Sequence, residues 1–172
     1  MTNGSHTSLV DIIEVLNHYK AHFRRESLPP LKPISGLYAL FPELESAPEV
    51  TAKWPDAWPD GGFQGVYFVF GTQLRLLYIG KASMRHQIGA RLSFWFKYAR
   101  PDRSCKVVHT GWSEQPRFVA TLAVPDGMAF EAPALEEFLI ERLSPPDNVN
   151  GRVCADANES HSLPSIPVNS AI

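Results

Sequence analysis

The chain has 172 residues, of which 44% are hydrophobic and 20% charged, so it holds enough apolar material for one buried core. No stretch approaches the roughly 20 apolar residues of a membrane span, and the first residues lack the basic and apolar regions of a signal peptide. We therefore expect a soluble, cytoplasmic protein with no membrane partner. The distant Cys105 and Cys154 predict free thiols, and the scattered histidines argue against a structural zinc site.

The net charge of −2 hides an asymmetry along the chain. Residues 75–117 contain nine Lys and Arg but only two acids, a local charge of +7, so the remainder sums to −9. Such a patch suits a polyanion held at one face of the protein. A charge run is also common on a merely solvated surface, and the charge pattern leaves both interpretations open.

The first predicted element is an amphipathic helix over 8–25, where apolar residues recur at spacings of three and four. Ser8 and Asp11 are placed as a variant of the capping box, and the prolines that follow stop the helix. In residues 34–60 a repeated Trp-Pro-Asp predicts turns. Its tryptophans more commonly anchor a loop to the core, and the alternative is that they stack on bases. We expect 1–60 to pack on the core as an extension that could recruit a protein partner or form a homodimer.

Two β-branched and aromatic runs predict strands near 64–70 and 74–79, joined by a hairpin loop. Both faces of each run are largely apolar, which favours central strands in a sheet covered on two sides. If Phe70 opposes Arg75 across the loop, Tyr67 lies directly opposite Tyr78 and the two phenols share one face.

The next element is a predicted helix over 88–99 that carries Arg91 on the flank of its apolar stripe. A third strand is expected near 116–124, and a last helix begins at about 130 or 133 and ends at 143. Together these elements, a hairpin, a third strand and helices, predict an α+β fold.

The composition divides this fold into three parts. Residues 61–150 form the expected core domain, with the N-terminal helical extension before it. Residues 151–172 are rich in Asn, Ser, Ala and Pro without apolar periodicity, which predicts a flexible tail.

Glu136 is the informative acid of the last helix. At 100° per residue it falls inside the apolar arc, whereas Glu137 and Glu141 face the opposite, solvated side. A carboxylate turned toward the core needs a cation, a hydrogen-bond network or a metal ion. A salt bridge to Arg142 or Arg91 satisfies this need as well as a functional site does, and periodicity alone favours the salt bridge.

Five short sequence motifs occur in a characteristic order. Gly65-Val66-Tyr67 is followed after ten residues by Tyr78-Ile79-Gly80-Lys81, then by Arg91-Leu92, Leu135-Glu136-Glu137 and Pro145-Pro146-Asp147-Asn148. In order and spacing they resemble the GIY-YIG endonuclease family over about residues 64–150, half the chain. The resemblance implies an α+β domain in which a three-stranded antiparallel sheet is flanked by helices. It also implies hydrolysis of DNA phosphodiester bonds with one divalent metal ion, Mg²⁺ or Mn²⁺.

The resemblance also implies roles for individual residues. Glu136 would hold the metal ion, a task that suits Mg²⁺ because this ion keeps several waters and binds through few protein oxygens. Tyr67 or Tyr78 would position and deprotonate the attacking water. A phenol with an ordinary pKa near 10 needs a nearby cation for that purpose, and Lys81 is suitably placed in the sequence.

Two basic residues would stabilise the phosphate charge, Arg91 through its planar fork and Lys81 as a point charge. Asn148 would support the site by hydrogen bonding. The chain between Lys81 and Arg91 is longer than in many relatives, so Arg85 remains a second candidate for the catalytic arginine. The histidine that often follows the arginine helix has no counterpart here unless His86 replaces it.

The basic stretch is expected to contact the DNA backbone. The predicted nucleic-acid-binding residues are Lys81, Arg85, Lys97, Arg100, Arg103 and Lys106. The leading hypothesis is a metal-dependent endonuclease with DNA as its partner. The alternative is a catalytically inactive module of the same type that binds nucleic acid or protein.

Overall fold

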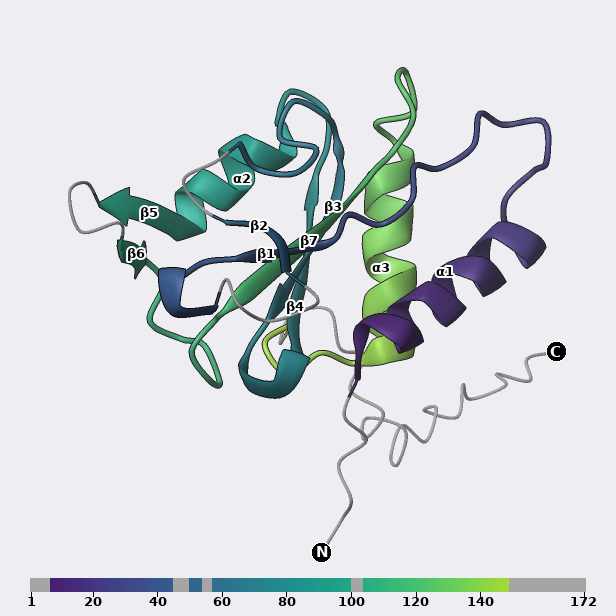
Figure 1. The fold of residues 1–172 in the computed structure, drawn as a ribbon. Coiled ribbons are helices and arrows are strands. Elements are labelled where there is room, and N and C mark those ends of the chain that lie inside the picture. The colour runs from purple at the N-terminus through teal and green to yellow at the C-terminus, as the bar shows by residue number, and fades with distance from the viewer. Residues whose placement is uncertain (1–6, 45–49, 54–56, 100–103, 149–172) are drawn as a thin grey trace, which may run out of the picture.

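A computed structural model describes residues 7–44, 50–53, 57–99 and 104–148 of the chain (Figure 1). The predictions for Trp54, Arg100, Arg103, Cys154 and the tail 151–172 lie outside the described residues. No helix in the described parts is long and apolar enough to cross a membrane.

The fold is α+β, as predicted. Its helices are α1 (Leu9–His22), α2 (Ile88–Trp95) and α3 (Glu131–Leu143). A mixed sheet of five strands has the order β2-β1-β7-β3-β4, and a separate ribbon pairs β5 with β6. The strands are β1 (Leu37–Ala39), β2 (Val50–Lys53), β3 (Gly65–Phe70), β4 (Leu76–Ala82), β5 (Phe96–Ala99), β6 (Ser104–Val107) and β7 (Phe118–Ala123).

The predicted three-stranded sheet is too small. Its strands are β4, β3 and β7, which pair antiparallel as expected, but β1 adds to β7 and β2 adds to β1 from within the N-terminal extension. These two strands have three and four residues, too short for an alternating pattern to distinguish them from turns. They form because hydrogen bonds to β7 extend the sheet, which no local pattern reveals.

The predicted helix over 88–99 is also partly wrong. It ends at Trp95, and the next four residues form β5. Phe96 pairs with Val107 of β6 and is fully buried, so strand pairing and burial override a helical spacing that continues through the sequence.

The sheet is covered on both faces, so the expectation for β3 is confirmed. Ile12, Leu16 and Leu135 bring α1 and α3 onto one apolar cluster, while Ile88 and Leu92 bring α2 onto the other. Figure 1 shows α1 and α3 together on one side of the sheet and α2 with β5 and β6 on the other. β4, however, lies at the edge of the sheet and is not a central strand.

The N-terminal helix is fixed at both ends. Ser8 Oγ accepts a hydrogen bond from the Asp11 N–H and Asp11 Oδ2 accepts one from the Ser8 N–H, which confirms the capping box. After the helix, Arg24 Nε lies 2.6 Å from Glu131 Oε1 in a buried ion pair at the start of α3. Trp58 anchors its loop, because the indole is buried and donates to Ser93 Oγ at 3.0 Å.

Candidate active site

The β3–β4 hairpin brings Tyr67 and Tyr78 onto the face covered by α2, with ring centroids 6.2 Å apart. The two tyrosines are diagonal neighbours and not directly opposite: Tyr67 pairs with Gly80, and Tyr78 pairs with Val69. The predicted register is wrong because the connection contains a 3-10 turn with positive φ at Gln73, and the ladder is irregular beside Phe70. The shared face of the phenols is confirmed.

Two glycines of the motifs have a steric reason to be glycine. A Cβ on Gly80 would lie 2.4 Å from the Oη of Tyr67, because this phenol crosses the backbone of β4 at that point. A Cβ on Gly65 would lie 2.1 Å from the carbonyl oxygen of Leu122 in β7. Both residues therefore permit close approaches that any side chain would prevent.

An aromatic wall surrounds the phenols, and no sequence motif pointed to it. Trp95 Nε1 donates a hydrogen bond of 3.0 Å to Tyr67 Oη. Tyr78 contacts Trp95 and Trp112 edge to face, with centroids 6.1 and 5.7 Å away, and His109 lies against both tryptophans. Trp95 was expected only as a core residue, while His109 and Trp112 lie in a stretch without periodicity. Their proximity follows from the β5–β6 ribbon returning the chain to the end of α2.

The phenols are protonated at neutral pH. Burial raises the pKa of Tyr67 well above its ordinary value, and the neighbouring Tyr78 adds to the rise. Burial also raises the pKa of Tyr78, followed by the charge of the Glu136 carboxylate. The Arg91 charge lowers the pKa of both phenols, but by less than burial raises it. The phenols are therefore suited to donating hydrogen bonds in this state.

Arg91 is the arginine that acts on the site. It is exposed on α2, and its charge acts on both phenols. Arg85 and His86 are exposed on the loop before α2, and neither is among the groups that shift the pKa of Tyr67 or Tyr78. The charges that shift the pKa of the phenols therefore favour Arg91 over Arg85.

Glu136 projects from α3 and forms an ion pair with Lys81 of β4. Neither Arg91 nor Arg142, the two partners expected from the sequence, fills this role. Lys81 is suited to it because it points to the α3 face of β4, opposite to Tyr78 and Gly80. The Glu136 side chain is 13% exposed and that of Lys81 36%, so the pair remains open to solvent. Because β4 is an edge strand, Glu136 still acts electrostatically on Tyr78.

Asn148 closes the free edge of β4. Its buried side-chain amide accepts a hydrogen bond from the Ile79 N–H and donates one to the Ile79 carbonyl, both 2.8 Å long. The Asp147 N–H donates to the Leu77 carbonyl at 3.0 Å. Asn148 therefore positions the strand that carries Tyr78, and it does so through the backbone and not through a contact with either phenol.

The site offers few protein donors for a divalent ion. Among the described residues no three His, Cys, Asp or Glu side chains gather as a metal site. Glu136 alone suits an ion such as Mg²⁺ that takes most of its ligands from water and substrate phosphate. The Glu136 carboxylate, which is mostly buried and paired with Lys81, can take such an ion only by exchanging its lysine partner for the metal.

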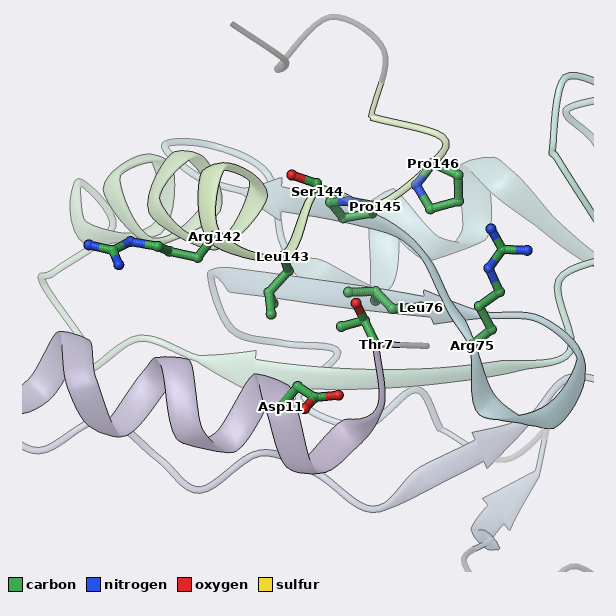
Figure 2. Close-up of a pocket in the computed structure, with 9 residues that line it drawn as sticks. All are labelled: Thr7, Asp11, Arg75, Leu76, Arg142, Leu143, Ser144, Pro145 and Pro146. Atoms are coloured by element: carbon green, nitrogen blue, oxygen red, sulfur yellow. The ribbon is translucent and has the colours of Figure 1, made fainter. Parts of the chain in front are cut away.

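A cavity of about 490 Å³ lies away from these groups, between the start of α1, the start of β4 and the end of α3 (Figure 2). Leu76, Leu143 and the segment after α3 line it, and none of the predicted catalytic residues does. Figure 2 shows the guanidinium groups of Arg75 and Arg142 pointing outward in different directions. The cavity is therefore not a preformed anion site.

No protein-family model, curated protein or solved structure matches the chain. The family resemblance therefore depends on the sequence motifs alone.

Proposed function

We propose that the chain is a metal-dependent endonuclease of the GIY-YIG type, which hydrolyses DNA phosphodiester bonds. The observation that carries the proposal is that two paired phenols, Tyr67 and Tyr78, experience the charges of both Arg91 and Glu136. The four residues come from four elements, β3, β4, α2 and α3. A scissile phosphate needs such a combination of cation, carboxylate and hydrogen-bond donors.

Each residue has a role that follows from its chemistry. Arg91, exposed beside the phenols, binds nonbridging phosphate oxygens with its planar fork. Tyr78 and Tyr67, protonated at neutral pH, orient the attacking water by hydrogen bonds. Glu136 would hold the Mg²⁺ or Mn²⁺ ion, which supplies electrophilic stabilisation of the phosphate when bound. Lys81, freed from Glu136, adds positive charge near the leaving oxygen.

The test is cleavage of supercoiled and branched DNA with Mg²⁺ or Mn²⁺ by the parent and by Glu136→Gln. The matched control is Glu137→Gln, which changes the next residue of α3, an exposed carboxylate on the solvated side. We expect Glu136→Gln to abolish cleavage and Glu137→Gln to retain it. Equal cleavage by the parent and Glu136→Gln would reject the assignment.

One observation favours a second candidate, a module that binds nucleic acid without cutting it. Lys81 neutralises the Glu136 carboxylate, whose charge acts on the phenols, and both phenols have raised pKa values. If this arrangement persists with metal present, DNA would bind and remain intact. The binding module would be established if the parent protein retards DNA in a gel but cleaves none of these substrates with either ion.

A further inference from the structure

A row of aromatic rings leads from the candidate active site to the surface. Tyr78 contacts Trp95 and Trp112, and His109 lies 5.3 and 5.6 Å from these two indoles, measured between ring centroids. Phe94 meets Trp95 edge to face at 5.4 Å. The Phe94 residue is 65% exposed and His109 is also exposed, so the row ends in two rings that are open to solvent.

Positive charge accompanies this row. Arg91 precedes Phe94 by three residues on α2, a spacing that places both side chains on neighbouring positions of one helix face. Lys97 and Lys106 are exposed and oppose each other in register on the β5–β6 ribbon, which follows directly from α2 (Figure 1). Like charges directly opposite each other destabilise a ribbon, and an anion bound between them would remove that repulsion.

We propose that Phe94 and His109, two exposed rings that both contact Trp95, offer stacking faces for unpaired bases of single-stranded DNA, with the adjoining phosphates against Arg91. This inference rests on the proposed function and adds its substrate class, DNA with unpaired nucleotides at the site of cleavage. The faces of bases in a duplex are covered by their neighbours, so only an unpaired or extruded base can stack on a protein ring. Exposed aromatic rings beside cationic side chains are the combination that binds single strands.

The experiment measures fluorescence anisotropy of labelled DNA with the full chain in EDTA, where metal-dependent cleavage cannot occur. The probes are a short oligo-dT, an abasic strand of the same length and a blunt duplex. We expect oligo-dT to bind about tenfold more tightly than the abasic strand, and Phe94→Ala or His109→Ala to remove about tenfold of that affinity. Phe94→Trp and His109→Phe should retain binding, because they keep a stacking face.

The matched control is Phe130→Ala, which removes another exposed phenylalanine, 70% exposed at the start of α3. Equal affinity for oligo-dT and the abasic strand, or equal losses in Phe94→Ala and Phe130→Ala, would overturn the inference. Glu136-dependent cleavage together with binding that ignores the bases would overturn only this inference. Base-dependent binding by a chain that never cleaves would overturn only the proposed nuclease.

Discussion

The phenol of Tyr67 lies across the backbone of Gly80, so that a Cβ at position 80 would be 2.4 Å from the Tyr67 Oη. The absence of a side chain at Gly80, in the second motif, thus leaves space for the Tyr67 ring of the first motif. The glycine of the second strand sets where the tyrosine of the first strand lies, and Tyr78 is in contact with both, since its ring also approaches the position of that Cβ.

Gly80→Ala should therefore displace both phenols. We expect a loss of about 1–3 kcal/mol in the free energy of unfolding from overpacking, and a loss of about 100-fold in cleavage from misplaced groups. Urea denaturation and plasmid nicking measure the two effects. Gly62→Ala is the control, because a Cβ at that position meets nothing within 4 Å. If Gly80→Ala cleaves DNA as well as Gly62→Ala, the close approach of Tyr67 to Gly80 is not needed for cleavage.

Lys81→Met should distinguish the effect of the Lys81–Glu136 ion pair on metal binding from the effect of the Lys81 charge on cleavage. Lys81 is 36% exposed, so the free energy of unfolding should change by less than about 1 kcal/mol. Without the competing cation, Glu136 should bind Mg²⁺ more tightly, as measured by calorimetry, while cleavage at saturating Mg²⁺ falls because phosphate charge is less well stabilised. Lys20→Met, which changes an exposed lysine of α1, serves as the control. Unchanged Mg²⁺ affinity in Lys81→Met would show that the pair does not compete with the ion.

The raised pKa values of Tyr67 and Tyr78 predict a loss of stability in alkali. The native state keeps these protons to a higher pH than the unfolded chain, whose phenols titrate near their ordinary pKa of 10.0. Their contribution to stability is therefore complete below pH 10 and decreases as the pH rises above it. Urea denaturation from about pH 8 to 11 should show this decrease, and Tyr78→Phe should make it shallower. Equal slopes in the parent and Tyr78→Phe would contradict the prediction.

Asn148→Ala should loosen the edge of β4. Two hydrogen bonds to the Ile79 backbone are lost, which should lower the free energy of unfolding by about 2–3 kcal/mol. Hydrogen exchange should show the Ile79 amide losing its protection. In Asn148→Asp the carboxylate can still accept from the Ile79 N–H, so protection of that amide should persist. An Ile79 amide that stays protected in Asn148→Ala would mean that other groups hold the edge.

Burial of Cys105 predicts an unreactive thiol. Burial raises the pKa of Cys105 to about 12, so the thiolate that reacts with disulfide reagents is scarce at neutral pH. In a Cys154→Ser background, labelling by a thiol reagent should wait for unfolding in urea. Rapid labelling of the native protein would show that the apolar cluster beneath α2, to which Cys105 belongs, opens readily.

The sequence by itself determined the elements whose signals are local. The Ser8 and Asp11 cap starts α1, the apolar run from Gly65 to Phe70 forms β3, and helical periodicity defines α3 with Glu136 turned inward. Capping and periodicity act over a few neighbouring residues, which is why they can be read directly from the chain.

The tertiary structure decided the pairings between distant segments. Only it showed that Tyr67 faces Gly80, that Lys81 is the partner of Glu136, and that Trp95 holds the Tyr67 hydroxyl. Strand register depends on backbone angles in a connecting turn, and an inward acid takes whichever cation the packing of β4 and α3 brings near. Neither quantity is encoded in the spacing of residues along a single element, so both become defined only when the sheet and its helices pack together.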